Sequence, residues 1–179
     1  LDPEIVSTQL HGYSDASPNA YGAVTYVRLQ DSIGTVRVQV LFAKARVAPT
    51  KRVTLPRLEL MAAYLLSKMI AFLLKVLGKK IERYVCWSDS TITLSWIHRP
   101  TQVWKVFVAN RVQAIQQNTD PARWQFCPGD TNPADLVTRE ESLEKLSKDR
   151  LWWNGPQWLS KSPEEWPKNV VDREPFDCP

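Results

Sequence analysis

The sequence has few of the residues that bind zinc or form disulfide bonds. Its 179 residues include three Cys and two His, and no Cys-x-x-Cys pair occurs. An odd number of isolated Cys argues against a disulfide framework and against a zinc site such as the zinc-binding end of an integrase. The start of the chain has no basic segment followed by an apolar one, so we expect no secretion signal and an intracellular, cytoplasmic location.

The sequence also lacks a long uncharged apolar run and the motif of an aspartic protease. The most apolar stretch, 58–77, contains one Glu and two Lys. It therefore falls short of the roughly 18 to 20 uninterrupted apolar residues of a membrane span, and we expect a buried central helix. An aspartic protease needs Asp-Thr/Ser-Gly, and the nearest stretches, 31–34 and 89–91, do not match it.

Positive charge is concentrated in one part of the chain. Residues 28–83 contain twelve Lys or Arg against three acids, a local balance of +9, although the whole chain carries only +4. Residues 130–179 contain eleven acids against seven bases, a balance of −4. A basic half with an acidic tail indicates a polyanionic partner such as nucleic acid, and a merely solvated surface is the alternative.

The order of predicted elements indicates an α/β domain with a mixed five-stranded sheet flanked by helices. Strands are expected at 9–13, 20–29, 36–42, 84–87 and 123–127, and helices at 56–77, 90–97, 102–117 and 132–139. Short turns join the first three strands into an antiparallel meander, and the last two strands alternate with helices and are expected to run parallel. We expect a linker at 1–8, the domain at 9–141, a Trp-rich extension docked on it at 142–167, and at 168–179 a linker towards a following domain.

Four acids lie at the ends of these elements. Asp15 ends the first strand, Asp89 ends the fourth, Glu59 opens the long helix and Asp135 opens the last helix. Taken singly, each could be a turn former or a helix cap. If the first and fourth strands are parallel neighbours, however, Asp15 and Asp89 lie side by side. Clustered carboxylates repel unless a hard cation such as Mg²⁺ or Mn²⁺ neutralises them, and two such ions would suit phosphodiester hydrolysis.

Several short motifs, in their order and spacing, resemble the ribonuclease H domains of BEL/Pao-type LTR retrotransposon polyproteins. They are Ser14-Asp15-Ala16-Ser17, Ala43-Lys44-Ala45-Arg46-Val47-Ala48-Pro49, Pro56-Arg57-Leu58-Glu59-Leu60, Trp87-Ser88-Asp89-Ser90, Phe107-Val108-Ala109-Asn110-Arg111-Val112, Asn132-Pro133-Ala134-Asp135-Leu136 and Leu151-Trp152-Trp153-Asn154-Gly155-Pro156. The resemblance covers about 10–159 and implies a ribonuclease H-like fold. It also implies an endonuclease that hydrolyses the RNA strand of RNA·DNA hybrids during reverse transcription, leaving 3′-hydroxyl and 5′-phosphate ends.

By the same resemblance, Asp15, Glu59, Asp89 and Asp135 are catalytic residues and ligands of two Mg²⁺ or Mn²⁺ ions. The resemblance is incomplete, because the loop 125–131 contains no His and no basic segment separates the helices around 99–101. The missing loop His is expected to slow product release rather than remove the chemistry. Nucleic-acid contacts are therefore expected from Ser17, Lys44, Arg46, Lys51, Arg52, Arg57 and Ser90.

The expected partners follow from the resemblance as well. They are the RNA·DNA hybrid and the reverse transcriptase and integrase domains of the same polyprotein, with no membrane and no small-molecule cofactor, and the expected location includes virus-like particles. One alternative stays open, which is a catalytically silent ribonuclease H-like module that binds nucleic acid or serves as a connection or domesticated structural domain.

Tryptophans are concentrated in the predicted extension at 142–167. They could stack on bases, or they could pin an extended segment onto the domain. Their neighbours are apolar and the local charge is acidic, which favours docking. We expect Trp152, Trp153 and Trp158 to be buried, with a cost of about 3 kcal/mol for Trp153→Ala.

Overall fold

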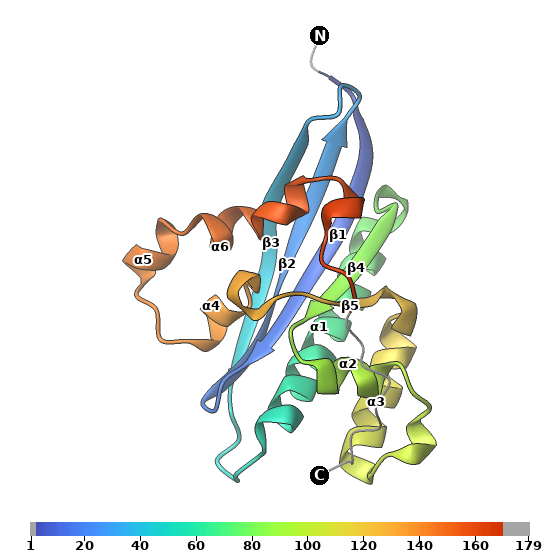
Figure 1. The fold of residues 1–179 in the computed structure, drawn as a ribbon, viewed down its shortest axis with the longest axis vertical. Helices are drawn as coiled ribbons and strands as arrows, with labels where there is room; N and C mark the ends of the chain where they lie inside the picture. The colour runs from blue at the N-terminus through green and yellow to red at the C-terminus, as the bar shows by residue number, and fades with distance from the viewer. Residues whose placement is uncertain (1–2, 170–179) are drawn as a thin grey trace.

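A mixed five-stranded sheet organises the structure, a computed structural model that describes residues 3–169 (Figure 1). The strands are β1 (Ile5–Ala16), β2 (Ala20–Asp31), β3 (Val36–Val47), β4 (Arg83–Ser88) and β5 (Trp124–Phe126). Their order in the sheet is β3-β2-β1-β4-β5, with β1, β2 and β3 antiparallel, and with β4 parallel to both β1 and β5. The predicted mixed sheet of a meander plus two parallel strands is thus confirmed.

Helices and a C-terminal segment cover the two faces of this sheet. The helices are α1 (Leu55–Leu77), α2 (Thr91–Ile97), α3 (Val106–Asn118), α4 (Asp135–Thr138), α5 (Leu143–Ser147) and α6 (Arg150–Asn154). Alternate residues of a strand point to opposite faces, so Cys86 packs with the core under α1 and α3, while Val85 and Trp87 pack with the core under the C-terminal segment.

The long helix α1 lies directly on β1. A Cβ atom at Gly12 would lie 2.5 Å from Leu66 Cδ1, so the absence of a side chain there permits the close approach. The helix ends at Gly78, whose φ of 57° suits glycine and whose N–H donates to the Leu74 carbonyl. By length and composition, α1 with the turn after it could cross a membrane, but 50% of its apolar window is buried. Its packing on β1 and β2 is that of a core helix.

The C-terminal extension lies against the second face of the sheet. The Tyr26 hydroxyl donates to the carbonyl of Trp152 (2.7 Å), and the Arg28 guanidinium donates to the carbonyl of Leu159 (2.9 Å). Trp166 is only 6% exposed and packs on His11, edge to face. The extension therefore closes one of the two hydrophobic cores of the domain.

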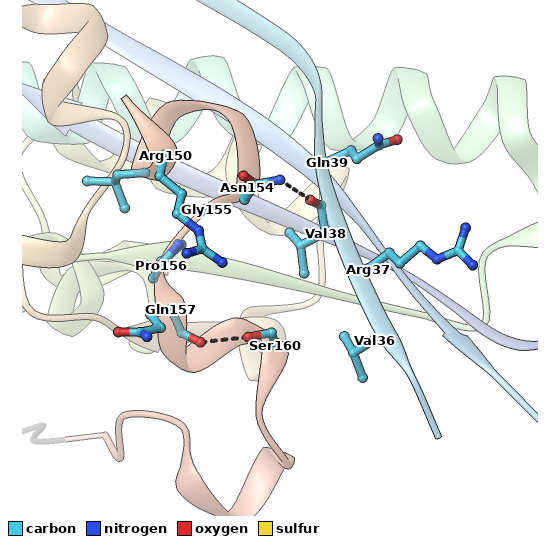
Figure 2. A pocket seen from close by; sticks show the side chains of 11 residues that line it. Val36, Arg37, Val38, Gln39, Arg150, Asn154, Gly155, Pro156, Gln157 and Ser160 are labelled. Carbon is cyan, nitrogen blue, oxygen red and sulfur yellow. Dashed lines mark hydrogen bonds between the residues drawn. The ribbon is translucent and has the colours of Figure 1, made fainter. Parts of the chain in front are cut away.

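A hollow of about 660 Å³ separates β3 from the extension (Figure 2). On one side, Asn154 Nδ2 donates to the Val38 carbonyl at 3.0 Å, which joins the extension to the edge strand. None of the predicted site residues lines this hollow, so it is separate from the acidic positions described below.

Predicted boundaries are wrong at two strand ends and at the start of α3, which begins at Val106 rather than near residue 102. Strand β1 begins at Ile5, inside the predicted linker 1–8, because Ile5 pairs with Asp31 and the Glu82 N–H donates to the Thr8 carbonyl. Strand β3 runs to Val47 instead of ending near residue 42, since its pairing with β2 continues to Ala20. Most of the predicted linker 168–179 lies outside the described residues.

Two further predictions need correction. Trp153 is 47% exposed, so the prediction that it is buried is wrong. Its indole N–H donates to the Ser147 carbonyl within the extension, and Trp152 and Trp158 are half-buried. The predicted helix 132–139 is α-helical only over Asp135–Thr138, and Asn132 does not cap it.

Candidate metal centre

Three acidic side chains converge at one end of the sheet. The parallel register pairs Ser14 of β1 with Ser88 of β4, so the next residues, Asp15 and Asp89, lie beside each other. Glu59 reaches the same place from the first turns of α1. Carboxylate oxygens of Asp15, Glu59 and Asp89 lie within 4.8 Å of one another. These three residues are called the acidic cluster below.

Burial and mutual repulsion make the charged form of the acidic cluster unfavourable. Burial, reinforced by the charge of Asp89, raises the pKa of Asp15 to about 7. Burial, reinforced by Asp15 and Asp89, raises the pKa of Glu59 to about 9. Burial also raises the pKa of Asp89. Among the residues that the structure describes, none hydrogen-bonds Glu59 Oε2, although that atom is buried. Three carboxylates in this state are well suited to surround a cation.

Residues of the segment 129–138 hold the aspartates in place. The Thr138 hydroxyl donates to Asp15 Oδ2 at 2.8 Å. Asn132 donates to the Ser14 carbonyl at 3.0 Å, directly before Asp15. Sequence reasoning missed Thr138, and it treated Asn132 only as a helix cap, because nothing in the local pattern shows that this segment folds back over β1.

Gly129 lies against the acidic cluster, where a side chain would contact Asp89. A Cβ atom there would lie 2.9 Å from Asp89 Oδ2, so even the smallest side chain would displace that carboxylate. The backbone of the segment therefore approaches the acidic cluster as closely as it can without displacing Asp89.

The fourth predicted acid, Asp135, stands apart from the other three. It begins α4, and its carboxylate Oδ1 pairs with Arg139 Nε at 2.8 Å. It does not belong to the group within 4.8 Å, but it is near enough for its charge to raise the pKa values of Asp15, Glu59 and Asp89. Its role as a metal ligand stays a prediction.

The two serines predicted to contact nucleic acid have structural bonds. The Ser17 hydroxyl donates to the Thr138 carbonyl at 2.9 Å, and the Ser90 hydroxyl accepts from the Thr93 N–H at the start of α2. Ser90 nevertheless borders a hollow of about 310 Å³ that Glu59 and Asp89 also line. A substrate entering the hollow would meet both the acids and the beginning of α2.

The predicted basic contacts lie along β3 and the approach to α1. Lys44 and Arg46 are exposed on β3, and Lys51 and Arg52 are exposed in the loop that follows it. Arg57 is half-buried on α1, with its guanidinium carbon 5.0 Å from the centre of the Phe107 ring. The structure thus places cationic side chains on the elements that lead to Glu59, and their contact with nucleic acid stays a prediction.

The strand order, the central helix and the acidic residues at the carboxyl ends of β1 and β4 define a ribonuclease H-like domain. Residues 2–90 match the family described as the Pao retrotransposon-like RNaseH-like domain, so this segment is similar to that family. The sequence resemblance to this group is thereby confirmed.

Solved structures similar to the chain are ribonucleases H of low sequence identity. RNase H1 from the halophilic archaeon Halobacterium salinarum NRC-1 is 13% identical, with a TM-score of 0.44 over 78% of this chain and 98% of that one. LC11-RNase H1, solved in complex with an RNA/DNA hybrid, is 15% identical, with a TM-score of 0.44 over 79% and 100%. The N-terminal RNase H domain of rv2228c from Mycobacterium tuberculosis is 15% identical, with a TM-score of 0.40 over 70% and 86%. No match was found among curated proteins.

Proposed function

We propose that this domain is a metal-dependent endonuclease that hydrolyses the RNA strand of RNA·DNA hybrids during reverse transcription of a retroelement. The observation that carries the proposal is the acidic cluster, whose oxygens lie within 4.8 Å at the carboxyl ends of β1 and β4. The family match over 2–90 supports the same class of protein.

The acidic cluster fits a hard divalent cation. Carboxylate oxygens are the ligands that Mg²⁺ and Mn²⁺ prefer, and the unpaired, buried Glu59 Oε2 lacks any other described partner. Asp15, Glu59 and Asp89 would hold the metal, and Asp135 is proposed as a fourth ligand for a pair of ions. When bound, such ions supply Lewis acidity and neutralise charge at the scissile phosphate.

The chain itself supplies rigid positioning of these acids. Thr138 fixes one oxygen of Asp15, and Asn132 ties the carboxyl end of β1 to the segment that passes Asp89. Misplacement of a reacting group by about 1 Å can cost a hundredfold in rate, so such fixed hydrogen bonds matter for hydrolysis.

Exposed cations are proposed to hold the hybrid through its phosphates. Lys51 and Arg52 precede α1 and are exposed, and a cation that contacts a phosphate releases a counterion on binding. Replacing either residue by Gln should lower the salt dependence of hybrid affinity by about one unit, whereas a solvated surface residue would leave it unchanged. The reverse transcriptase and integrase domains of one polyprotein are the proposed neighbours, within an intracellular particle.

A substrate panel tests the proposed function. The purified chain is incubated with an RNA·DNA hybrid, the matching RNA duplex and the single-stranded RNA, each labelled on the RNA strand, with Mg²⁺, Mn²⁺ or excess chelator. We expect cleavage of the hybrid alone, in the presence of metal, with 3′-hydroxyl products. Binding of the hybrid without any cleavage under all conditions would instead indicate a catalytically silent module.

A further inference from the structure

A second hollow lies beside α1, apart from the acidic cluster. Its volume is about 260 Å³, and its walls come from β2, β3, α1 and α3. Three of the lining side chains are cationic, namely Arg46, Lys68 and Arg111, and two are tyrosines, Tyr21 and Tyr64. Among the described residues that line it, none is acidic, so the hollow gathers positive charge without a counter-charge in its wall.

Aromatic rings hold two of these three cations in place. The Lys68 ammonium lies 4.3 Å from the centre of the Tyr64 ring, and the Arg111 guanidinium carbon lies 3.6 Å from the centre of the Phe107 ring. Arg111 also donates to the Phe107 carbonyl at 3.2 Å. Partial burial lowers the pKa of Arg111, which indicates a cation that water solvates poorly. An anion placed in the hollow would offset that lost solvation.

The hollow is aligned with the acidic cluster along α1. Arg57, Met61, Tyr64 and Lys68 recur every three to four residues and therefore share one face of the helix. Arg57 lies two residues from Glu59, and its guanidinium stacks on the same Phe107 ring as Arg111. Lys68 is nine residues beyond Glu59, about 14 Å along the helix axis. That distance corresponds to about four nucleotides of a duplex strand.

We propose that this hollow binds a single backbone phosphate of a nucleic acid whose neighbouring nucleotides lie over the acidic cluster. Arg46 and Arg111 supply planar guanidinium donors, Lys68 supplies a compact ammonium, and the Tyr64 ring holds the lysine in the wall. The proposal that the hollow binds a phosphate group depends only on the residues that line the hollow. The link to a substrate at the acidic cluster rests on the proposed function.

The first test measures hybrid affinity in chelator by fluorescence anisotropy at several salt concentrations. Lys68→Gln and Arg46→Gln each remove one charge from the hollow. Lys75→Gln is the matched control, because Lys75 is exposed on the same helix face, two turns further along and outside the hollow. We expect the first two variants to weaken affinity about fivefold to tenfold and to lower the salt slope by about one unit, with the control unchanged.

A second experiment distinguishes a specific phosphate site from non-specific electrostatic attraction of nucleic acid. Inorganic phosphate, followed by chemical-shift changes of backbone amides around Tyr64, should bind the wild type saturably and Lys68→Gln much more weakly. Arg111 is less suitable for substitution, since its stacking on Phe107 also packs α3. Melting temperatures of all variants check that the fold is intact.

The combined results distinguish a failure of the phosphate site from a failure of the proposed function. Equal affinity and equal salt slope for Lys68→Gln and Lys75→Gln would overturn the inference, even if the wild type cleaves hybrids. Loss of binding in Lys68→Gln together with an absence of cleavage by the wild type would uphold the phosphate site and overturn the proposed function. Binding of free phosphate without any change in hybrid affinity would overturn the link to nucleic acid.

Discussion

Replacing Glu59 by Gln should flatten the pH dependence of the stability of the metal-free domain. In the folded chain the pKa of Glu59 is raised from its ordinary 4.5 to about 9, and that of Asp15 from 3.8 to about 7. Between about pH 5 and 7 the folded state therefore holds protons on both groups that the unfolded chain has released. The stabilisation is complete below the unfolded pKa values and is lost as the pH rises through the folded ones.

The magnitude follows from proton linkage. Each proton held only by the folded state lowers the free energy of unfolding by about 1.4 kcal/mol per pH unit as the pH rises. Asp15 and Glu59 together contribute a loss of up to about 2.7 kcal/mol per pH unit between pH 5 and 7. Buried His11 opposes this loss, because its pKa is lowered to about 3 and only the unfolded chain holds a proton on it below about pH 6.5. The wild type should therefore lose about 1 to 2 kcal/mol per unit over this range. Glu59→Gln keeps the opposing contributions of Asp15 and His11, so its stability should be nearly independent of pH, with a slope about 1.4 kcal/mol per unit less steep than that of the wild type.

Urea unfolding in excess chelator at pH 5, 6 and 7 measures both slopes. The matched control is Glu144→Gln, because the Glu144 side chain is 82% exposed and pairs with Lys148 at the end of the same short helix. Glu144→Gln should show the same dependence of unfolding free energy on pH as the wild type. A wild-type stability that stays constant or rises over this range would refute the electrostatic account of the acidic cluster, and so would a slope for Glu59→Gln equal to that of the wild type.

Two further substitutions test the surroundings of the acidic cluster and the docked extension. Gly129→Ala should leave the unfolding free energy within about 1 kcal/mol but reduce hybrid cleavage at least tenfold, because its Cβ would lie 2.9 Å from Asp89 Oδ2 and displace that carboxylate. Cleavage by Gly129→Ala at the wild-type rate would show that the Asp89 carboxylate need not be fixed for activity. Trp166→Ala should cost about 3 kcal/mol in urea unfolding, since Trp166 is 6% exposed, whereas Trp153→Ala, at 47% exposed, should cost about 1 kcal/mol or less. The reverse order would contradict the observed docking of the extension.

The sequence contains enough information to predict the sheet and the convergence of three acids. Asp15 and Asp89 each end an apolar strand, and two parallel neighbouring strands place their last residues at one edge whatever the details of packing. Glu59 could be assigned to the same site from the sequence. A carboxylate near the start of an otherwise apolar helix is costly to bury unless a cation compensates its charge. These inferences depend on local patterns and on one topological rule.

The predictions that failed concern features that depend on tertiary contacts. Strand β3 extends to Val47 because its partner β2 continues to pair with it as far as Ala20. Thr138 reaches Asp15 across 123 residues of sequence, a contact that no local pattern reveals. Trp153 lies in a helix of five residues, which is too short to show a periodic buried face, so its exposure could not be read from spacing.

The measurement that tests the central claim most directly is the initial rate at which Glu59→Gln and the wild type cleave the RNA strand of a labelled hybrid in saturating Mg²⁺. Hybrid affinity is measured on the same samples, so that a loss of rate can be separated from a loss of binding. The account predicts cleavage by the wild type, none in excess chelator, and a rate reduced at least a hundredfold in the variant, which should still bind the hybrid. Wild-type rates for Glu59→Gln, or full wild-type activity in chelator, would contradict the assignment of the acidic cluster as a metal-dependent hydrolytic centre.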